Sequence, residues 1–188
     1  VPGLKVVTPS NPQNAYDLLL HSFIDQNPVI FMEHKLTYKI KDNVVLNGMP
    51  SSSDLLGKAN IESEGNEITI VSYSNMVNVV KDAISSDELS GTSVELIDLQ
   101  TLSPLDMETI LSSVTKTEKL LVCQEAPANS SVGSTVISNV VQSGAFSSLS
   151  IAPKLVSGLH SPMPSAKHLE TTVIPQKEDI IQIIKDMV

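Results

Sequence analysis

Residues 94–126 restrict the possible folds of this chain more than any other stretch. The stretch begins with the mainly apolar segment Val94–Leu99, and the apolar run Leu120–Cys123 lies near its end. Between them lie a short loop with a Ser-Pro pair and a segment whose apolar residues recur at helical spacing. Strand, loop, amphipathic helix and strand in this order are typical of a crossover between two parallel strands. The stretch therefore predicts a parallel sheet.

The sequence around this stretch alternates in the same way. We expect strands at 58–62, 68–72 and 154–156, and helices at 76–84, 132–141 and 176–187. A regular alternation of strands and helices predicts an α/β fold, in which a mostly parallel sheet has helices on both faces.

The first residues form a separate, smaller pattern. A strand at 4–7, a helix that starts near Pro12 and a strand at 29–32 make one strand–helix–strand unit. One face of this helix carries Ala15, Leu18, Leu19, Ser22 and Phe23 at helical spacing. One such unit cannot bury both faces of its sheet, so we expect it to be the remnant of a larger α/β domain. The sequence Asn-Gly-Met-Pro-Ser-Ser-Ser that follows has the composition of a linker. We thus divide the chain into residues 1–42, a linker at 43–57 and a domain at 58–188.

Composition excludes several kinds of partner. The 188 residues carry 21 acidic and 12 basic side chains, a net charge of -9, and every basic residue is a lysine. Nucleic-acid binding needs clustered basic residues, so we expect none. No apolar stretch reaches the ~18 residues of a membrane span, so we expect no membrane segment. The single cysteine, Cys123, cannot form an internal disulfide, which fits a soluble protein of a reducing compartment.

Motifs that identify a reaction are missing from the sequence. It has no Gly-x-Gly-x-x-Gly, no Walker loop and no Gly-x-Ser-x-Gly. The histidines do not have the spacing of a metal site. They are His21, His34, His160 and His168, and we expect His21 on a solvated face of its helix.

Two charged positions directly follow predicted strands. The triplet Glu33-His34-Lys35 follows the strand at 29–32, and Glu125 follows the strand at 120–123. Open parallel sheets bind ligands at the carboxyl ends of their strands, so both are candidates for polar contacts in a crevice. The alternative is that each is an ordinary solvated loop residue. Gly133, which opens a predicted helix, permits close approach of a backbone or a ligand, and Asp106 fits the N-cap of the helix after it.

Several phrases, taken together in order, resemble one family. Residues 1–12 (Val-Pro-Gly-Leu-Lys-Val-Val-Thr-Pro-Ser-Asn-Pro) and 27–38 (Asn-Pro-Val-Ile-Phe-Met-Glu-His-Lys-Leu-Thr-Tyr) resemble the pyrimidine-binding domain of the β subunit of thiamine-diphosphate-dependent 2-oxo acid dehydrogenases. Residues 68–73, 94–106 (Val-Glu-Leu-Ile-Asp-Leu-Gln-Thr-Leu-Ser-Pro-Leu-Asp), 124–127 and 161–164 resemble the C-terminal domain of the same subunit. The resemblance extends over essentially the whole chain.

The resemblance implies the C-terminal part of such a β subunit, with a transketolase-like fold. The family decarboxylates pyruvate or a branched-chain 2-oxo acid on thiamine diphosphate and magnesium and passes the acyl group to a lipoyl carrier. Its acidic and histidine active-site residues lie upstream of the positions matched here. We therefore assign no catalytic or cofactor-binding residue and expect this chain alone to be inactive. The alternatives are the β subunit of an acetoin dehydrogenase and a non-catalytic interaction protein with the same fold.

The resemblance also implies partners and one metal site. The expected partners are an α subunit, a second β subunit and the lipoyl-carrying acyltransferase subunit. In the family, backbone carbonyls at the positions of Ser22, Asp25 and Asn27 help to hold a potassium ion, with a further ligand upstream. The alternative is a plain C-terminal turn of a helix. The implied location is the cytoplasm in a bacterium, or the mitochondrial matrix or plastid in a eukaryote.

Five positions depart from the family pattern. Gln100 stands where the family usually has Arg, Thr135 where a Glu is common, His160 where Asp is usual and Ser165 where Tyr is usual. Ser150 occupies the place of an acidic residue that helps some relatives to bind the lipoyl-carrying subunit. These changes place the binding of that subunit, and activity, in question.

Overall fold

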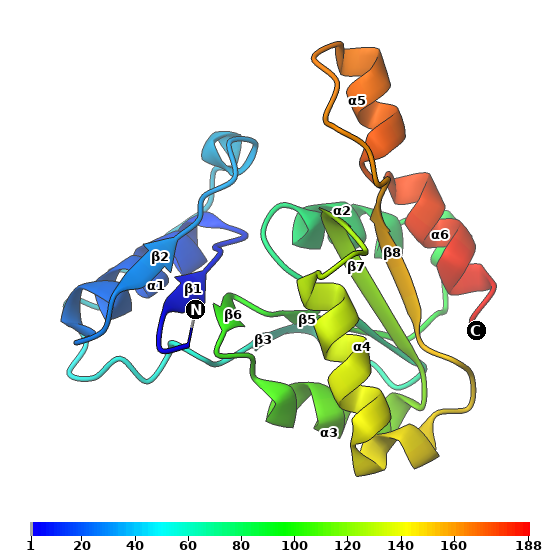
Figure 1. The fold of residues 1–188 in the computed structure, drawn as a ribbon, viewed down its shortest axis with the longest axis horizontal. Helices are drawn as coiled ribbons and strands as arrows, with labels where there is room; N and C mark the ends of the chain where they lie inside the picture. The colour runs from blue at the N-terminus through cyan, green and yellow to red at the C-terminus, as the bar shows by residue number, and fades with distance from the viewer. Residues whose placement is uncertain (1) are drawn as a thin grey trace.

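The computed structural model describes residues 2–188, which form two β-sheets with helices around them (Figure 1). The strands are β1 (Lys5–Val7), β2 (Val29–Phe31), β3 (Asn60–Ser63), β4 (Ile68–Ser72), β5 (Val94–Asp98), β6 (Thr101–Ser103), β7 (Leu120–Pro127) and β8 (Lys154–Gly158). The α-helices are α1 (Pro12–Ile24), α2 (Met76–Ile84), α3 (Met107–Thr117), α4 (Val132–Gln142), α5 (Lys167–Val173) and α6 (Lys177–Lys185). Short 3-10 helices lie at Thr37–Lys39, Asp87–Leu89 and Gly144–Ser148.

The larger sheet has the strand order β3-β5-β4-β7-β8. Strands β5, β4, β7 and β8 are parallel, and β3 is an antiparallel edge strand paired with β5. The predicted parallel sheet and the predicted edge strand are thus confirmed. The stretch 94–126 is also confirmed as a crossover, and it passes over β4, which pairs with both β5 and β7.

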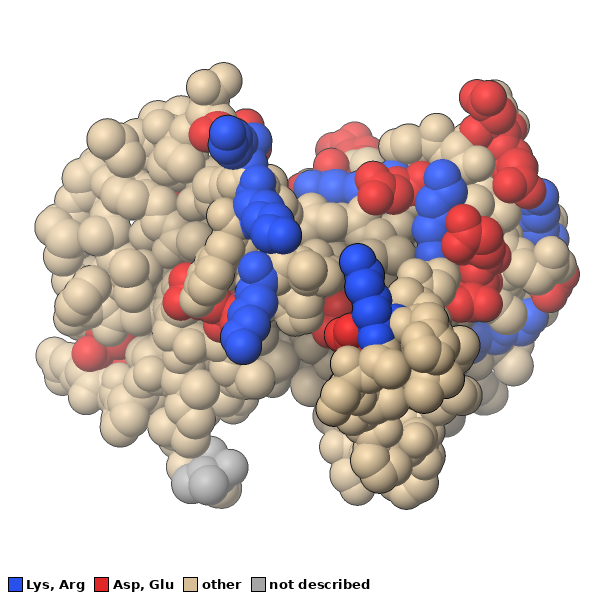
Figure 2. All heavy atoms as spheres, turned by 90° about the horizontal axis from the view of Figure 1, so that it is seen from above, with Lys and Arg blue, Asp and Glu red and all other residues tan. Residues whose placement is uncertain are grey.

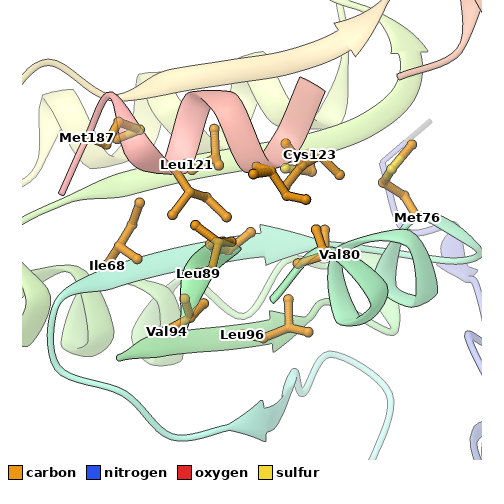
Figure 3. Close-up of a cluster of buried hydrophobic side chains, with 14 of the residues drawn as sticks. Ile68, Met76, Val80, Leu89, Val94, Leu96, Leu121, Cys123 and Met187 are labelled. Atoms are coloured by element: carbon orange, nitrogen blue, oxygen red, sulfur yellow. The ribbon is translucent and has the colours of Figure 1, made fainter. Parts of the chain in front are cut away.

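Helices cover both faces of this sheet, as the alternation predicted. Side chains of α2 and α6 pack against one face, in a cluster that includes Ile70, Leu121 and Cys123 (Figure 3). Side chains of α3 and α4 pack against the other face around Val71 and Val122. Full burial of an aliphatic side chain contributes ~1.5–3 kcal/mol, so these two layers are the main source of stability. Cys123 is a free thiol inside the first layer, where burial raises its pKa.

The smaller sheet has the order β2-β1-β6, and it joins strands from the first 31 residues to one strand at residues 101–103. Strands β1 and β2 are parallel, and β6 adds to β1 in the antiparallel direction. Strand β6 comes from the loop after β5, which the sequence pattern represented only as a tight Pro-containing loop. Three residues give too little periodicity to predict a strand, and the partner of β6 lies about a hundred positions away in the chain.

The N-terminal unit, which we define as residues 2–42, has a small core. Val7 and Leu18 are fully buried and pack with Leu56. The sequence pattern also placed Phe23 on the apolar face of α1, but its side chain is 72% exposed. This part of the prediction was wrong, because helical spacing places Phe23 beside Leu19 on a flank of α1 that nothing covers in residues 2–188.

One other feature differs from the sequence-based expectation. Helix α5 was not predicted, since its seven residues carry few apolar side chains at helical spacing. It projects from the rest of the fold after the extended segment that contains Pro162 and Pro164 (Figure 1).

None of the helices in residues 2–188 has the length and apolar character needed to cross a membrane.

Candidate functional site

A cleft separates the N-terminal unit from the α/β domain, which we define as residues 58–188. It lies where β2, β4 and β7 end, and it contains two adjoining cavities of about 280 and 610 Å³. Both cavities are lined by Glu33, His34 and Glu125. Seen from above, the molecule is hollowed between these two parts, and charged side chains gather along the hollow (Figure 2). Lys35 and Lys167 contribute to the lining of the larger cavity.

The structure brings together two positions that the sequence suggested separately. His34 follows β2, Glu125 lies near the end of β7, and His34 Nε2 is 3.2 Å from Glu125 Oε2. Both side chains are largely shielded from solvent, with 29% and 28% of their surface exposed. They therefore form a polar bridge across the cleft between the two parts of the chain.

The contacts of His34 limit what it can do chemically. Its Nδ1 accepts a hydrogen bond from the backbone N–H of Leu36 at 3.2 Å, so the proton of the neutral ring belongs on Nε2, which donates to Glu125. The other oxygen of Glu125 accepts from Asn75 Nδ2 at 3.4 Å. Neither ring nitrogen is free to take a proton from a substrate. The geometry favours a connecting role for His34 over a role as a general base.

The hydroxyl-bearing side chains of Thr8, Tyr73 and Ser74 also line the smaller cavity. Burial and the nearby charge of Glu125 raise the pKa of Tyr73, which stays neutral at physiological pH. The hydroxyl of Thr8 is buried and has no hydrogen-bond partner within residues 2–188. Met32 and Leu102 supply the apolar part of this lining.

We expect the bridge across the cleft to be measurable but modest. Removal of both partners by His34→Ala and Glu125→Ala should show a coupling free energy of about 0.5–1 kcal/mol, because both groups keep part of their hydration. The measurement is a double-mutant cycle by urea unfolding at pH 7. The matched control pairs His34→Ala with Glu170→Ala, since Glu170 lines the same cavity without a hydrogen bond or ion pair to His34 in the described structure. Equal coupling in both cycles would show that the His34–Glu125 contact is not formed.

The other histidines lie apart from the cleft. His160 and His168 are exposed. His21 is half-buried on α1, not solvated as its helical position suggested, and its Nδ1 has no partner within residues 2–188. No group of three or more His, Cys, Asp or Glu side chains in this part of the chain is arranged to hold a metal ion.

Two single-residue expectations have clear outcomes. Asp106 caps α3 as predicted: its Oδ1 accepts from the backbone N–H of Thr109 at 3.2 Å, and its Oδ2 accepts from that of Ala59 at 3.1 Å. Gly133 does permit a close approach, and the approaching group is the side chain of Gln124. Gln124 Oε1 accepts from the Gly133 N–H at 2.8 Å, and a Cβ at position 133 would lie 2.6 Å from the same oxygen.

The three positions expected to hold potassium lie at the C-terminal end of α1. The hydroxyl of Ser22 donates to the carbonyl of Leu18 at 2.7 Å, and Asp25 Oδ1 accepts from the Asn27 N–H at 2.8 Å. Within residues 2–188, no backbone N–H is bonded to the carbonyl oxygens of these three residues. The ammonium group of Lys5 pairs with the Asp25 carboxylate and holds its pKa well below the ordinary range.

The positions that depart from the family pattern fall into two groups. Thr135, Ser150, His160 and Ser165 are exposed. Gln100 is buried at the junction of the two sheets, with a positive φ of 52°. Its backbone carbonyl accepts from the Thr8 N–H at 2.7 Å. Four of the five departures from the family pattern therefore change the surface, and only the departure at Gln100 lies in the interior.

A buried polar cluster at this junction was not found from the sequence. Asp98, at the end of β5, is fully buried and lies 2.5 Å from the hydroxyl of Ser10 in the N-terminal unit. The other carboxyl oxygen accepts from the Gln100 N–H at 3.1 Å. Burial raises the pKa of Asp98 to about 7. The only sequence signal was that Asp98 is one of two acidic residues in a mainly apolar strand.

The mostly parallel sheet, its crossovers and the cleft at the strand ends define an open α/β domain with helices on both faces. Residues 57–180 match the family described as "Transketolase, C-terminal domain". The chain belongs to this family.

Curated relatives match nearly the whole chain. The pyruvate dehydrogenase E1 component subunit beta of Rickettsia conorii is 37% identical over 98% of this chain and 56% of the relative. The mitochondrial subunit beta-1 of Oryza sativa subsp. japonica is 38% identical over 98% of the chain and 50% of the relative. The acetoin:2,6-dichlorophenolindophenol oxidoreductase subunit beta of Cupriavidus necator is 37% identical over 96% and 52%. The chain spans about half the length of these relatives.

A solved structure has the same fold. It is described as a split gene transketolase, an inactive beta4 tetramer, and it superposes with a TM-score of 0.73 over 100% of this chain and 58% of its own. The sequence identity is 17%, so this likeness concerns the fold.

Proposed function

We propose that this chain is the C-terminal part of the β subunit of a thiamine-diphosphate-dependent 2-oxo acid dehydrogenase that acts on pyruvate or a branched-chain 2-oxo acid. The observation that carries the proposal is the similarity to pyruvate dehydrogenase E1 β subunits, which continues through both the N-terminal unit and the α/β domain. In this proposal the two-part organisation reflects residues 1–42 of a pyrimidine-binding domain, a linker at 43–57 and a C-terminal domain at 58–188.

The role of these residues in the reaction is assembly. Both nitrogens of His34, the histidine of the cleft, are already engaged, which does not suit this side chain to proton transfer. We therefore assign catalysis to other parts of the complex. The residues described here position the strands and loops against which those parts pack.

Exposed apolar side chains support this role. Phe23, Ile30 and Leu46 are 72%, 43% and 75% exposed, all in or next to the N-terminal unit. Exposed apolar surface of this kind marks contacts with other chain segments or subunits. In our proposal the contacts are with an α subunit and a second β subunit. Binding of the lipoyl-carrying acyltransferase subunit is the weakest element, because Ser150 is a neutral surface residue.

The potassium site is a second element of the proposal. The carbonyl oxygens of Ser22, Asp25 and Asn27 lack backbone donors, which leaves them available to a cation that prefers oxygen ligands. A longer β subunit that binds potassium should unfold at a higher temperature in KCl than in tetramethylammonium chloride of the same ionic strength. Equal unfolding temperatures in the two salts would remove the ion from the proposal.

Activity measurements test the main proposal. The 188-residue chain alone, with thiamine diphosphate and magnesium, should decarboxylate neither pyruvate nor a branched-chain 2-oxo acid, whereas the longer β subunit together with its α subunit should decarboxylate one of them. Acetoin as a substrate distinguishes the alternative represented by the Cupriavidus relative. If the assembled subunits bind each other but act on none of these substrates, the chain belongs to a non-catalytic interaction protein.

The proposed location is the cytoplasm of a bacterium, or a mitochondrion or plastid.

A further inference from the structure

The junction between the N-terminal unit and the α/β domain contains a chain of buried hydrogen bonds. The hydroxyl of Ser10 contacts Asp98 Oδ2 at 2.5 Å, Asn14 Oδ1 at 2.8 Å and Asn11 Nδ2 at 3.3 Å. Ser10 and Asp98 are both fully buried, and Asn14 is 8% exposed. Ser10 and both asparagines belong to the N-terminal unit, and Asp98 belongs to the α/β domain. The contact between Ser10 and Asp98 therefore joins the two parts.

The number of protons available to these hydrogen bonds indicates the protonation state of Asp98. A hydroxyl has one proton to donate and two lone pairs that accept. If Asp98 were ionised, the Ser10 hydroxyl would lie beside two acceptor oxygens, Asp98 Oδ2 and Asn14 Oδ1. Its single proton could reach only one of them, so the other short contact would have no donor. If Asp98 is protonated, it donates to Ser10, Asn11 donates to Ser10, and Ser10 donates to Asn14. Only the protonated acid satisfies every contact as the amides are oriented.

The surroundings of Asp98 favour the same state. The charged groups that face it are Glu62 of β3 and Lys81 of α2, which form an ion pair at 2.5 Å and act on Asp98 in opposite directions. The side chains that the N-terminal unit contributes, Ser10, Asn11 and Asn14, are uncharged. No cation is therefore left over to compensate a buried carboxylate, and burial dominates.

We propose that the carboxyl group of Asp98 is a proton-dependent latch, which holds the N-terminal unit against the α/β domain when protonated and loosens this contact when it ionises. The latch acts together with the Thr8–Gln100 backbone hydrogen bond and the pairing of β1 with β6. It is a property of the chain itself and does not rest on the proposed enzymatic function.

Hydrogen exchange across the junction tests the latch. The reporter is the amide of Thr8, which bonds to the Gln100 carbonyl across the junction, and the reference is the amide of Val122 in the large sheet. After division by the intrinsic exchange rate at each pH, the opening constant at Thr8 should rise about 50-fold between pH 5 and pH 7 and level off above pH 8. The opening constant in Asp98→Asn should not change with pH, because the amide donates to Ser10 at every pH.

Two controls separate the latch from other sources of pH dependence. His34→Asn removes the other titratable bridge across the cleft, and the rise at Thr8 should persist in this variant. A carbon-13 NMR titration of the Asp98 carboxyl should show that it is still mostly protonated at pH 6. A carboxyl already ionised at pH 5, as would occur with the Asn14 amide turned over, overturns the proposal. A Thr8 opening constant that is independent of pH, or a rise that is lost in His34→Asn, overturns it as well.

Discussion

The Asp98→Asn variant is expected to be more stable than the unsubstituted chain at pH 8, by up to ~4 kcal/mol. The folded state raises the pKa of Asp98 from 3.8 to about 7, and each pKa unit corresponds to about 1.36 kcal/mol. The folded state therefore binds the proton more tightly than the unfolded chain. The contribution of Asp98 to the free energy of unfolding therefore falls as the pH rises from about 4 to about 7, and it is constant above pH 7. The amide keeps the hydrogen bonds of the protonated acid and never ionises.

Urea unfolding followed by circular dichroism measures this difference, because the chain has no tryptophan to report by fluorescence. The stability difference between the variant and the unsubstituted chain should be small at pH 4 and largest at pH 8. Asp106→Asn is the matched control. Hydrogen bonds from Ala59 and Thr109 lower the pKa of Asp106. The stability that the ionised Asp106 contributes is therefore present above pH 4 and is lost as the pH falls. Parallel pH profiles for the two variants would contradict the assigned state of Asp98.

The second large effect is expected for Gly158→Ala, which should destabilise the chain by about 3 kcal/mol through steric overpacking. Gly158 is the last residue of β8, opposite Pro127 of β7. A Cβ at this position would lie 2.2 Å from the carbonyl oxygen of Glu125 and 3.3 Å from that of Val173. Both are backbone atoms, so the clash can be relieved only by moving β7 or the segment at the end of α5.

Thermal unfolding measures this effect, and a loss of 3 kcal/mol corresponds to a fall in Tm of roughly 6–12 °C for a chain of this size. Gly144→Ala is the matched control, because nothing lies within 4 Å of the added Cβ. An unchanged Tm for Gly158→Ala would mean that β7 and β8 separate easily near the cleft. In that case the bridge from Glu125 to His34 could not be rigid.

The sequence predicted most of the large sheet because its strands and helices carry strong local periodicity. Val94–Leu99 is mainly apolar and Leu120–Cys123 is wholly apolar, as expected for buried strands, and the two segments bracket a clear amphipathic helix. Strand β6 and helix α5 could not be predicted, since each is short and depends on contacts with distant residues. The edge strand was placed two residues early, at 58 rather than 60, because end residues carry little periodic signal.

The candidate site was predicted in part. The rule that ligands lie at the carboxyl ends of parallel strands identified His34 and Glu125, and the structure places them in contact. The sequence could not show that both nitrogens of His34 are engaged, because this depends on the turn to Leu36. The contact between Ser10 and Asp98 joins residues 88 positions apart, and no local pattern reports such a pair.

The pairing of β1 with β6 has a consequence for how the chain could be divided. Because a strand of the α/β domain completes the sheet of the N-terminal unit, the segment 43–57 is not the only connection between the two parts. A break in the backbone within that segment would leave two pieces that share a sheet and the buried contact between Ser10 and Asp98. Such a chain would behave as a pair of complementing fragments, in which the shorter piece folds only on the template that the longer one provides.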